Sequence, residues 1–478
     1  MPLAAGLISH SAQGYLGCHT PGHKQGRGAL PEWRRLLGDR VFQLDLTELP
    51  GLDNLHDSQG IIREAEEAAA AYFGARRTFF LINGATAGIL AVIMAKSRPG
   101  SKVVLPRTSH QAVIHGLILS GAQPVYLPVR SSAELGLPGH VTEAELNACL
   151  AGLGEEALVV LLHPNYYGLA GEMRGQVAAA RRHNCAVLAD EAHGAHFCTS
   201  SLFPIPALEA GADFAVQSAH KVLGSFTQTA FLHCRLENDL ERVRELLRIV
   251  QSSSPSYLLM ASLDAARCQC QTGKEGWEAA ARLGEKLRLR ISRLPGVLAP
   301  GEELLQTPGA AEYDPTRLVV NISGLRITGF EAAEWLRRRR KILVEMADLQ
   351  NLVFILGPAD GEQEADILLE GLGAMAASCS AGGCKERRGH PDPLRLPVPR
   401  QAMTPRDAFF APHSPVEWEH ACGKIAAELI APYPPGTPVI CPGEMIREEA
   451  LDFLKEWEAA GGVWPGKSRG AIKIVTGS

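Results

Sequence analysis

The sequence predicts an α/β protein in which helices cover a large, mostly parallel sheet. Short apolar runs of the kind found in buried strands alternate with longer helical stretches. Clusters of Gly, Ser, Thr, His and Asp follow these runs directly, at the strand ends where parallel sheets bind ligands. The expected strands are residues 78–82, 103–105, 123–129, 157–162, 186–190, 213–217 and 227–234.

Composition limits the classes of function. The chain has 478 residues, of which 46% are hydrophobic, enough for a globular protein with a sizeable core. Its 47 basic and 52 acidic residues give a net charge of −5, so no basic excess indicates a nucleic-acid partner. The first 15 residues contain Gly, His and Gln and offer neither a signal sequence nor a membrane span, so we expect a cytoplasmic protein.

The eleven cysteines are scattered along the chain, which favours reduced thiols over a disulfide framework. Cys268, Cys270, Cys379 and Cys384 lack the spacing and the partners of a zinc site. We therefore expect no structural metal.

The expected strand 78–82 leads into the turn Asn83 to Gly88 and then into a helix over 89–95. Free N–H groups at the helix start and the Thr86 hydroxyl would converge on one point, which suits a phosphate. The turn matches neither a P-loop nor a dinucleotide fingerprint. It predicts a phosphate site that includes Gly84, Ala85 and Thr86.

Lys221 is expected on a loop between the strands 213–217 and 227–234, flanked by apolar residues. Such surroundings ease the loss of a proton and make a lysine a nucleophile toward an aldehyde, although a lysine that merely reaches out to solvent fits the same pattern. Asp190 ends the strand 186–190. A lysine for the aldehyde and an acid for the ring nitrogen are the pair that pyridoxal phosphate (PLP) needs.

His110 follows the strand 103–105 and precedes a helix expected over 112–120. It could simply cap that segment. Alternatively, its flat imidazole could stack on a pyridine ring at the strand-end site.

The first 60 residues contain two polar stretches. Residues 14–30 are rich in Gly and His and predict an ordered loop or arm, while residues 44–60 are acidic. The acidic stretch is either a solvated loop or an acidic wall for a cationic substrate. Its carboxylates are Asp45, Glu48, Asp53 and Asp57.

The remaining segments predict further domains. A helix is expected over 61–73, and a small α/β region has strands 318–322 and 352–356 around the arginine-rich helix 330–342. The arginine run fits a solvated helix face. The predicted parts are an arm (1–60), a large cofactor domain (61–305), a small domain (306–375), a linker (376–400) and a C-terminal domain (401–478).

An ordered set of motifs is similar to the PLP-dependent ornithine/lysine/arginine decarboxylase family, in its short form, which has the fold-type-I aminotransferase architecture. The similarity runs essentially from end to end, since residues 252–267, 336–348, 403–410 and 432–444 also resemble it. The motifs, in chain order, are HTPGHKQG, NGATAG, RTSHQ, NYYGLAG, LADEAHGAHF and QSAHKVLGSFTQTA.

The resemblance implies roles for individual residues. Lys221 would hold PLP as the internal aldimine, Asp190 would pair with the pyridine nitrogen, and His110 would stack on the ring. Ala85 and Ala87 stand where relatives often carry hydroxyl residues, so Thr86 and backbone amides would hold more of the phosphate. Gln111 stands where a lysine is common in the family. The remaining implied cofactor contacts are Ser218 and His220 at the phosphate and His193 near the ring hydroxyl.

The resemblance also implies a function, which is PLP-dependent decarboxylation of a basic amino acid in polyamine-type metabolism by a homodimer. Arginine is favoured over lysine and ornithine. Lys221, His220 and Cys441 are alternative donors of the proton to Cα, and Glu444 or the acidic loop would bind the substrate's cation. An aminotransferase, a carbon–carbon lyase of the same fold, or an inactive homologue that binds PLP or a polyamine as a regulator remain alternatives.

Overall fold

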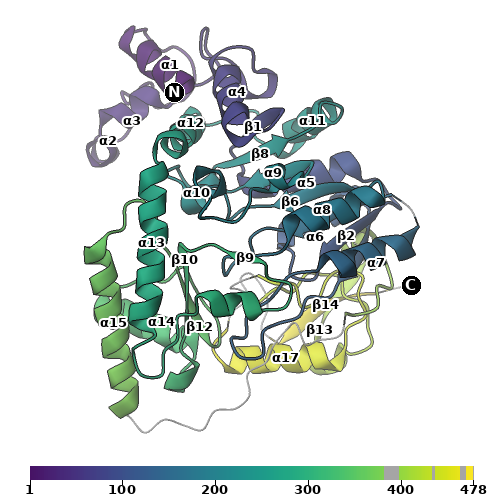
Figure 1. The fold of residues 1–478 in the computed structure, drawn as a ribbon. Coiled ribbons are helices and arrows are strands. Elements are labelled where there is room, and N and C mark those ends of the chain that lie inside the picture. Colours follow the sequence, from purple (N-terminus) through teal and green to yellow (C-terminus); the bar gives the residue numbers. More distant parts are fainter. Residues whose placement is uncertain (155, 382–397, 433–435, 463–469, 477–478) are drawn as a thin grey trace. The chain divides into compact units, whose positions relative to one another are not determined.

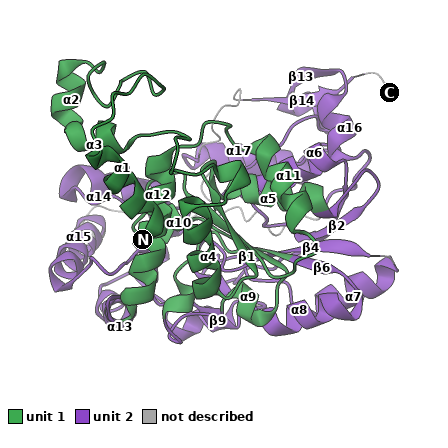
Figure 2. Cartoon of the chain, turned by 90° about the horizontal axis from the view of Figure 1, so that it is seen from above, with its two compact units in different colours: residues 1–95, 188–199, 206–274 green, residues 96–187, 200–205, 275–478 purple. Residues whose placement is uncertain are grey.

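The computed structural model describes residues 1–154, 156–381, 398–432, 436–462 and 470–476. The chain divides into two compact units, each built from several chain segments (Figure 2). Unit 1 contains residues 1–95, 188–199 and 206–274, and unit 2 contains residues 96–187, 200–205 and 275–478.

The strands in unit 1 are β1 (Arg77–Leu81), β8 (Ala230–Cys234), β7 (Phe214–Gln217) and most of β6 (Ala186–Asp190), in this spatial order. β6 and β7 are parallel, whereas β8 is antiparallel to both β7 and β1. Every residue of β1, β7 and β8 is buried, which explains their nearly continuous apolar sequences.

The large-sheet strands in unit 2 are β4 (Ala157–Leu162), β2 (Lys102–Pro106) and β3 (Gln123–Leu127), and both neighbouring pairs are parallel. Parallel neighbours need a crossover connection. The helix α6 (Gln111–Ser120) connects β2 to β3, and α7 (Glu143–Leu153) connects β3 to β4. The predicted α/β fold with a large, mostly parallel sheet is confirmed.

Helices α1 (Pro2–Ala12), α4 (Ile61–Phe73) and α12 (Tyr257–Thr272) pack together in unit 1 (Figure 1). α4 has the predicted bounds and ends at Gly74, whose left-handed conformation suits a glycine. The other helices here are α2 (Pro31–Leu37), α3 (Asp39–Leu44), η1 (Leu55–Asp57), α5 (Gly84–Lys96), η2 (Phe197–Thr199), α9 (Ala207–Ala210), α10 (Ala219–Val222) and α11 (Leu240–Val250).

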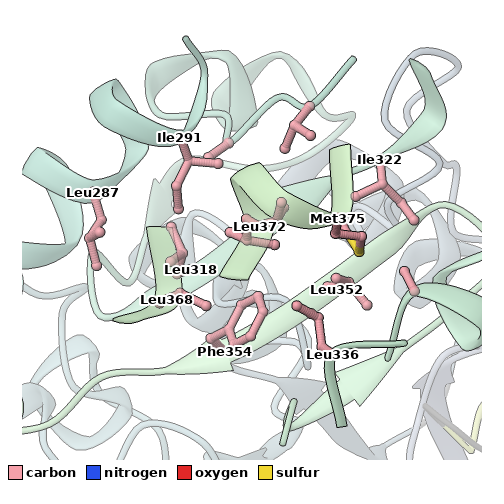
Figure 3. Close-up of a cluster of buried hydrophobic side chains, with 14 of the residues drawn as sticks. Leu287, Ile291, Leu318, Ile322, Leu336, Leu352, Phe354, Leu368, Leu372 and Met375 are labelled. Carbon is pink, nitrogen blue, oxygen red and sulfur yellow. The ribbon is translucent and has the colours of Figure 1, made fainter. Parts of the chain in front are cut away.

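A small α/β region in unit 2 has a three-stranded sheet, β10 (Arg317–Asn321), β12 (Asn351–Ile355) and β11 (Met346–Ala347). Figure 3 shows its apolar core, in which leucines of the strands meet Leu372 and Met375. The helices that supply the rest of this core are α13 (Lys274–Ile291), α14 (Gly329–Arg340) and α15 (Glu362–Ala381).

The C-terminal part of unit 2 has its own apolar cluster, to which α17 (Glu448–Ala459) contributes Leu454 and Trp457. The Thr404 hydroxyl accepts the Asp407 N–H and caps α16 (Pro405–Phe410), whose Thr-Pro start is typical of a helix N-terminus. The remaining elements of unit 2 are β5 (Leu169–Ala170), α8 (Met173–Arg182), η3 (Glu302–Gln306), β9 (Glu312–Tyr313), η4 (Ser323–Leu325), β13 (His413–Glu417), η6 (Trp418–His420) and β14 (Ala471–Val475).

Several strands and helices begin or end one to three residues away from the expected positions, and two larger differences change the interpretation of the chain. α5 begins at Gly84 rather than at residue 89, because the Gly/Ala/Thr turn itself forms the first helical turns. α15 continues to Ala381, and its buried Ala376 packs in the small core, so helix extends into the segment predicted as a linker. Residues 382–397 of that segment lie outside the described residues, and the domain boundaries stay a prediction.

Candidate active site

The turn before α5 presents backbone N–H groups at a helix N-terminus. Gly84 has a φ of 73°, which glycine adopts without strain, and its N–H donates to the Gln228 carbonyl at 2.8 Å. Thr86 is exposed in the first turn, whereas Ala85 is buried. The first N–H groups of a helix lack intrahelical partners and, with the helix dipole, attract anions. These residues have the chemistry of an anion site, and their binding of a phosphate stays a prediction.

Asp190 lies on the face of the sheet that α5 covers. It is paired with Val216 of β7, and residues paired in neighbouring strands point to the same face. A Cβ added at Gly88 of α5 would lie 3.2 Å from the Val216 side chain and 2.8 Å from that of Leu81, so α5 packs closely on this face. The Asp190 carboxylate is 3% exposed, which suits an acid that pairs with a ring nitrogen away from water.

Lys221 lies in the one-turn helix α10, so the expectation that it lies on a loop is wrong. Ser218 precedes the helix, and the Lys221 N–H donates to its carbonyl at 3.3 Å, closing the turn. The short helix directs the lysine side chain toward the loop after β6. There Lys221 Nζ lies 3.0 Å from His193 Nε2.

Two consecutive carbonyls connect the lysine helix to the phosphate turn. The Gln228 carbonyl accepts the Gly84 N–H, and the Thr229 carbonyl lies 2.9 Å from His220 Nδ1. His220 was predicted as a catalytic and phosphate-binding residue, and this contact shows that it also anchors α10. Because both partners attach to one dipeptide, the anion site and Lys221 are held close together.

His110 is at the N-terminus of α6 in unit 2, where its Nδ1 accepts the Ala112 N–H at 3.2 Å. It therefore acts as a helix cap, which was one of its two expected roles. Its stacking on a cofactor ring stays a prediction.

A buried polar chain lies on the other face of the sheet in unit 1. His233 Nε2 lies 3.0 Å from Gln217 Oε1, and the Gln217 amide donates to Glu191 at 2.8 Å. His233 Nδ1 lies 2.8 Å from the Thr78 hydroxyl, and Glu191 also accepts the Ala207 N–H at 2.8 Å. Burial raises the pKa of Glu191 to about 8 and lowers the pKa of His233 to about 3.

Sequence reasoning missed this chain and the contact between His193 and Lys221. A strand alternates its side chains between two faces, so the pair Asp190-Glu191 already indicated one carboxylate for each face. The partners of Glu191 come from other elements, and which residues meet depends on the strand register, which cannot be read from the sequence.

A second buried cluster lies in unit 2. Arg107 makes a two-pronged ion pair with Glu444, with one distance of 2.9 Å, and donates to the Val439 carbonyl at 2.8 Å. Its guanidinium also stacks over the Tyr126 ring, 4.7 Å from the centroid. Glu444, expected to bind the substrate's cation, thus has a cation of the protein as its partner.

Cys441, one of the predicted proton donors, lies in the same cluster. Its Sγ is 3.5 Å from Arg107, and burial raises the pKa of the thiol to about 12. The thiol is therefore protonated at neutral pH, and its role as a donor stays a prediction.

The acidic loop contains carboxylates of two kinds. Asp53 accepts N–H groups of Gly60 at 2.8 Å and Ile62 at 3.0 Å and so caps α4. Burial would raise the pKa of Asp53, but these and neighbouring backbone donors lower it below its ordinary value. Asp45 lies 3.1 Å from His23, whereas one carboxylate oxygen of Glu48 is buried without a hydrogen-bond partner among the described residues.

Within the described ranges, no group of three or more His, Cys, Asp and Glu side chains could hold a metal ion, and no two cysteines form a disulfide. No described helix is long and apolar enough to cross a membrane.

The residues of unit 1 fit PLP by their chemistry. A helix N-terminus suits the phosphate, a buried carboxylate suits the ring nitrogen, and an amine held by α10 suits the aldehyde. With the mostly parallel sheet, they define the fold of the fold-type-I PLP-dependent enzymes. The likeness to solved structures agrees, since the fold matches the lysine decarboxylase LdcF of Francisella novicida over 99% of this chain and 81% of that chain, with a TM-score of 0.83 at 19% identity.

The chain belongs to the Orn/Lys/Arg decarboxylase family. The family's major domain matches residues 1–364, and its C-terminal domain matches residues 394–470. The arginine decarboxylase of Bacillus subtilis is 36% identical over 95% of this chain and 92% of the relative. The lysine decarboxylase LdcA of Pseudomonas aeruginosa is 25% identical over 96% of this chain and 76% of the relative.

Proposed function

We propose that this protein decarboxylates arginine with the help of PLP. The observation that carries the proposal is the Lys221 amine, held on α10 beside His193 and tied through residues 228–229 to an anion site. The arginine decarboxylases among the relatives are 34–36% identical to this chain, and the lysine decarboxylases are 24–25% identical. This difference favours arginine over lysine and ornithine.

Bound PLP supplies an electron sink for the electrons of the broken Cα–carboxylate bond. The residues of the chain bind and orient the reacting groups. Thr86 and the first amides of α5 would hold the phosphate, and Asp190 would keep a proton on the ring nitrogen. Lys221 would supply the amine that holds the cofactor through its aldehyde.

The test is release of carbon dioxide from arginine, lysine and ornithine by the PLP-loaded protein. We expect turnover of arginine above the other two and its loss in Lys221→Ala, because the change removes the proposed nucleophile. Lys455→Ala, a change of an exposed lysine on α17, is the matched control. A keto acid as product would indicate an aminotransferase, and PLP binding without any turnover would indicate a regulator.

Glu48 is the proposed partner of the substrate's guanidinium. One Glu48 oxygen is buried and has no hydrogen-bond partner among the described residues, so it could accept a hydrogen bond from a substrate cation. By contrast, Asp53 caps a helix and Glu444 pairs with Arg107. Glu48→Gln should raise KM for arginine while the absorbance of bound PLP stays unchanged. An unchanged KM and substrate ranking would contradict this role.

A homodimer is proposed from the exposed apolar side chains of the first 45 residues. Leu16, Leu30 and Leu36 are each more than 70% exposed, and α2 buries none of its residues. Such a surface is typical of an interface. Sedimentation of the PLP-loaded protein as a monomer would contradict the proposed homodimer.

Polyamine-type metabolism and a cytoplasmic location remain part of the proposed function.

A further inference from the structure

The contact between His193 and Lys221 has a consequence beyond cofactor binding. We propose that His193 accepts the proton of Lys221 when the lysine bonds to PLP and returns that proton when the lysine is released. The inference rests on the proposed function and adds a catalytic residue to it. Asp190, three residues earlier at the end of β6, has a different proposed role at the ring nitrogen.

The distance between Lys221 Nζ and His193 Nε2, 3.0 Å, is that of a hydrogen bond between two nitrogens. One nitrogen donates and the other accepts, so the pair shares one proton. Two positive charges this close repel strongly even at a moderately high effective dielectric constant. An ammonium at Lys221 therefore faces a neutral imidazole, which is a base.

Lys221 needs such a base because only its neutral amine is a nucleophile. In the transfer, an N–H bond at Nζ breaks, an N–H bond at Nε2 forms, and the positive charge moves from the lysine to the imidazole. The reverse transfer restores the ammonium. His193 is 3% exposed, so the proton stays within the protein rather than passing directly to bulk water.

Backbone hydrogen bonds and close packing hold the loop that carries His193, which favours a proton transfer at fixed geometry. The Gly194 N–H donates to the Glu191 carbonyl at 2.9 Å, and the Glu191 N–H donates to the Val216 carbonyl at 2.9 Å. A Cβ at Gly194 would lie 2.8 Å from both the Glu191 and Phe197 side chains, so the turn requires glycine. The Glu191 side chain anchors the same turn from the far face of the sheet.

The experiment measures how fast the full-length protein, freed of PLP, bonds to added PLP. Stopped-flow absorbance gives the rate, and borohydride reduction with peptide mapping identifies Lys221 as the bonded residue. His193→Ala is expected to lower this rate by about 100-fold, at the low end of general acid–base effects. Imidazole in the buffer should restore much of the rate, because it fits the space that the side chain leaves.

Two controls separate proton transfer from simple binding. His56→Ala removes a histidine of the same unit whose Nε2 contacts the Ser252 carbonyl, and it should neither slow the reaction nor respond to imidazole. In the Lys221→Ala background, where no covalent bond forms, a further His193→Ala change removes only the implied contact to the ring hydroxyl, so PLP should still bind. His193→Gln, which keeps the bulk of the side chain, should be slow and insensitive to imidazole, and it serves if the alanine variant fails to fold.

Equal rates for the wild type and His193→Ala would overturn the inference. A second combination of results would also overturn it. In that case imidazole does not rescue the slow His193→Ala variant, and the double variant Lys221→Ala/His193→Ala no longer binds PLP. His193 would then only hold the cofactor. A wild-type protein that bonds no PLP at Lys221 would instead overturn the proposed function, and the inference with it.

Discussion

The two faces of the sheet in unit 1 use consecutive carboxylates in different ways. Asp190 lies on the face covered by α5, with the proposed cofactor residues. Glu191 lies on the other face, where Gln217, His233 and Thr78 form a buried hydrogen-bond chain. The first face carries the residues proposed to bind the cofactor, and the second carries groups that hydrogen-bond to one another. Because side chains alternate along a strand, the end of β6 places one carboxylate on the proposed cofactor face and the next on the face with the buried hydrogen-bond chain.

Among the variants that test the difference between the two faces, Asp190→Asn should have the largest effect, a loss of kcat. An amide cannot keep the ring nitrogen protonated, so kcat should fall about 100-fold or more, as when one preorganised electrostatic contact is lost. The free energy of unfolding should change little. Glu241→Gln, the same change at an exposed ion pair of α11, is the control. A variant that loses only substrate affinity would contradict the role of Asp190.

Gln217→Leu tests the supporting face. The change removes the donor to Glu191 and the acceptor for His233 and leaves two buried polar groups unsatisfied. Stability should fall by about 1–3 kcal/mol, the usual cost of an unsatisfied buried group, and urea unfolding measures it. The kcat of the folded, PLP-loaded variant should change far less than in Asp190→Asn. Equal losses of kcat would remove the distinction between the two faces.

The smallest expected effect is a change in the pH dependence of stability. The pKa of Glu191 is about 8 in the folded protein, above its ordinary value, so the folded state keeps a proton that the unfolded state has lost. The stability from this group is present at low pH and declines as the pH rises toward 8. Between pH 7.5 and 8, where His233 is largely neutral in both the folded and the unfolded state, Glu191→Gln should flatten a slope of at most about 1.4 kcal/mol per pH unit. Parallel slopes for the two proteins would contradict the raised pKa.

Sequence reasoning found what depends on local pattern. The buried strands, the helix 61–73, Asp190 at the end of one strand and Lys221 shortly after another all follow from residues close together in the chain. It placed Lys221 on a loop because a one-turn helix is too short to show a helical period.

What the sequence did not show depends on distant partners. The contact of His193 with Lys221 requires the loop after β6 and the helix after β7 to meet, and Glu444 was assigned to a substrate because its partner Arg107 is far away in the chain. Strand register and packing determine which distant residues meet, and neither can be read from a single sequence.

The ion pair of Arg107 and Glu444 joins residues 337 positions apart. A ribosome that adds about 5–20 residues per second needs roughly 17–70 s to make the intervening chain. During that time the arginine at the end of β2 lacks the anion that neutralises it in the finished protein, so this strand end cannot mature while synthesis is under way. The C-terminal segment is thus the part that completes assembly. A fragment that stops before Glu444 would lack the carboxylate that neutralises the buried Arg107 guanidinium.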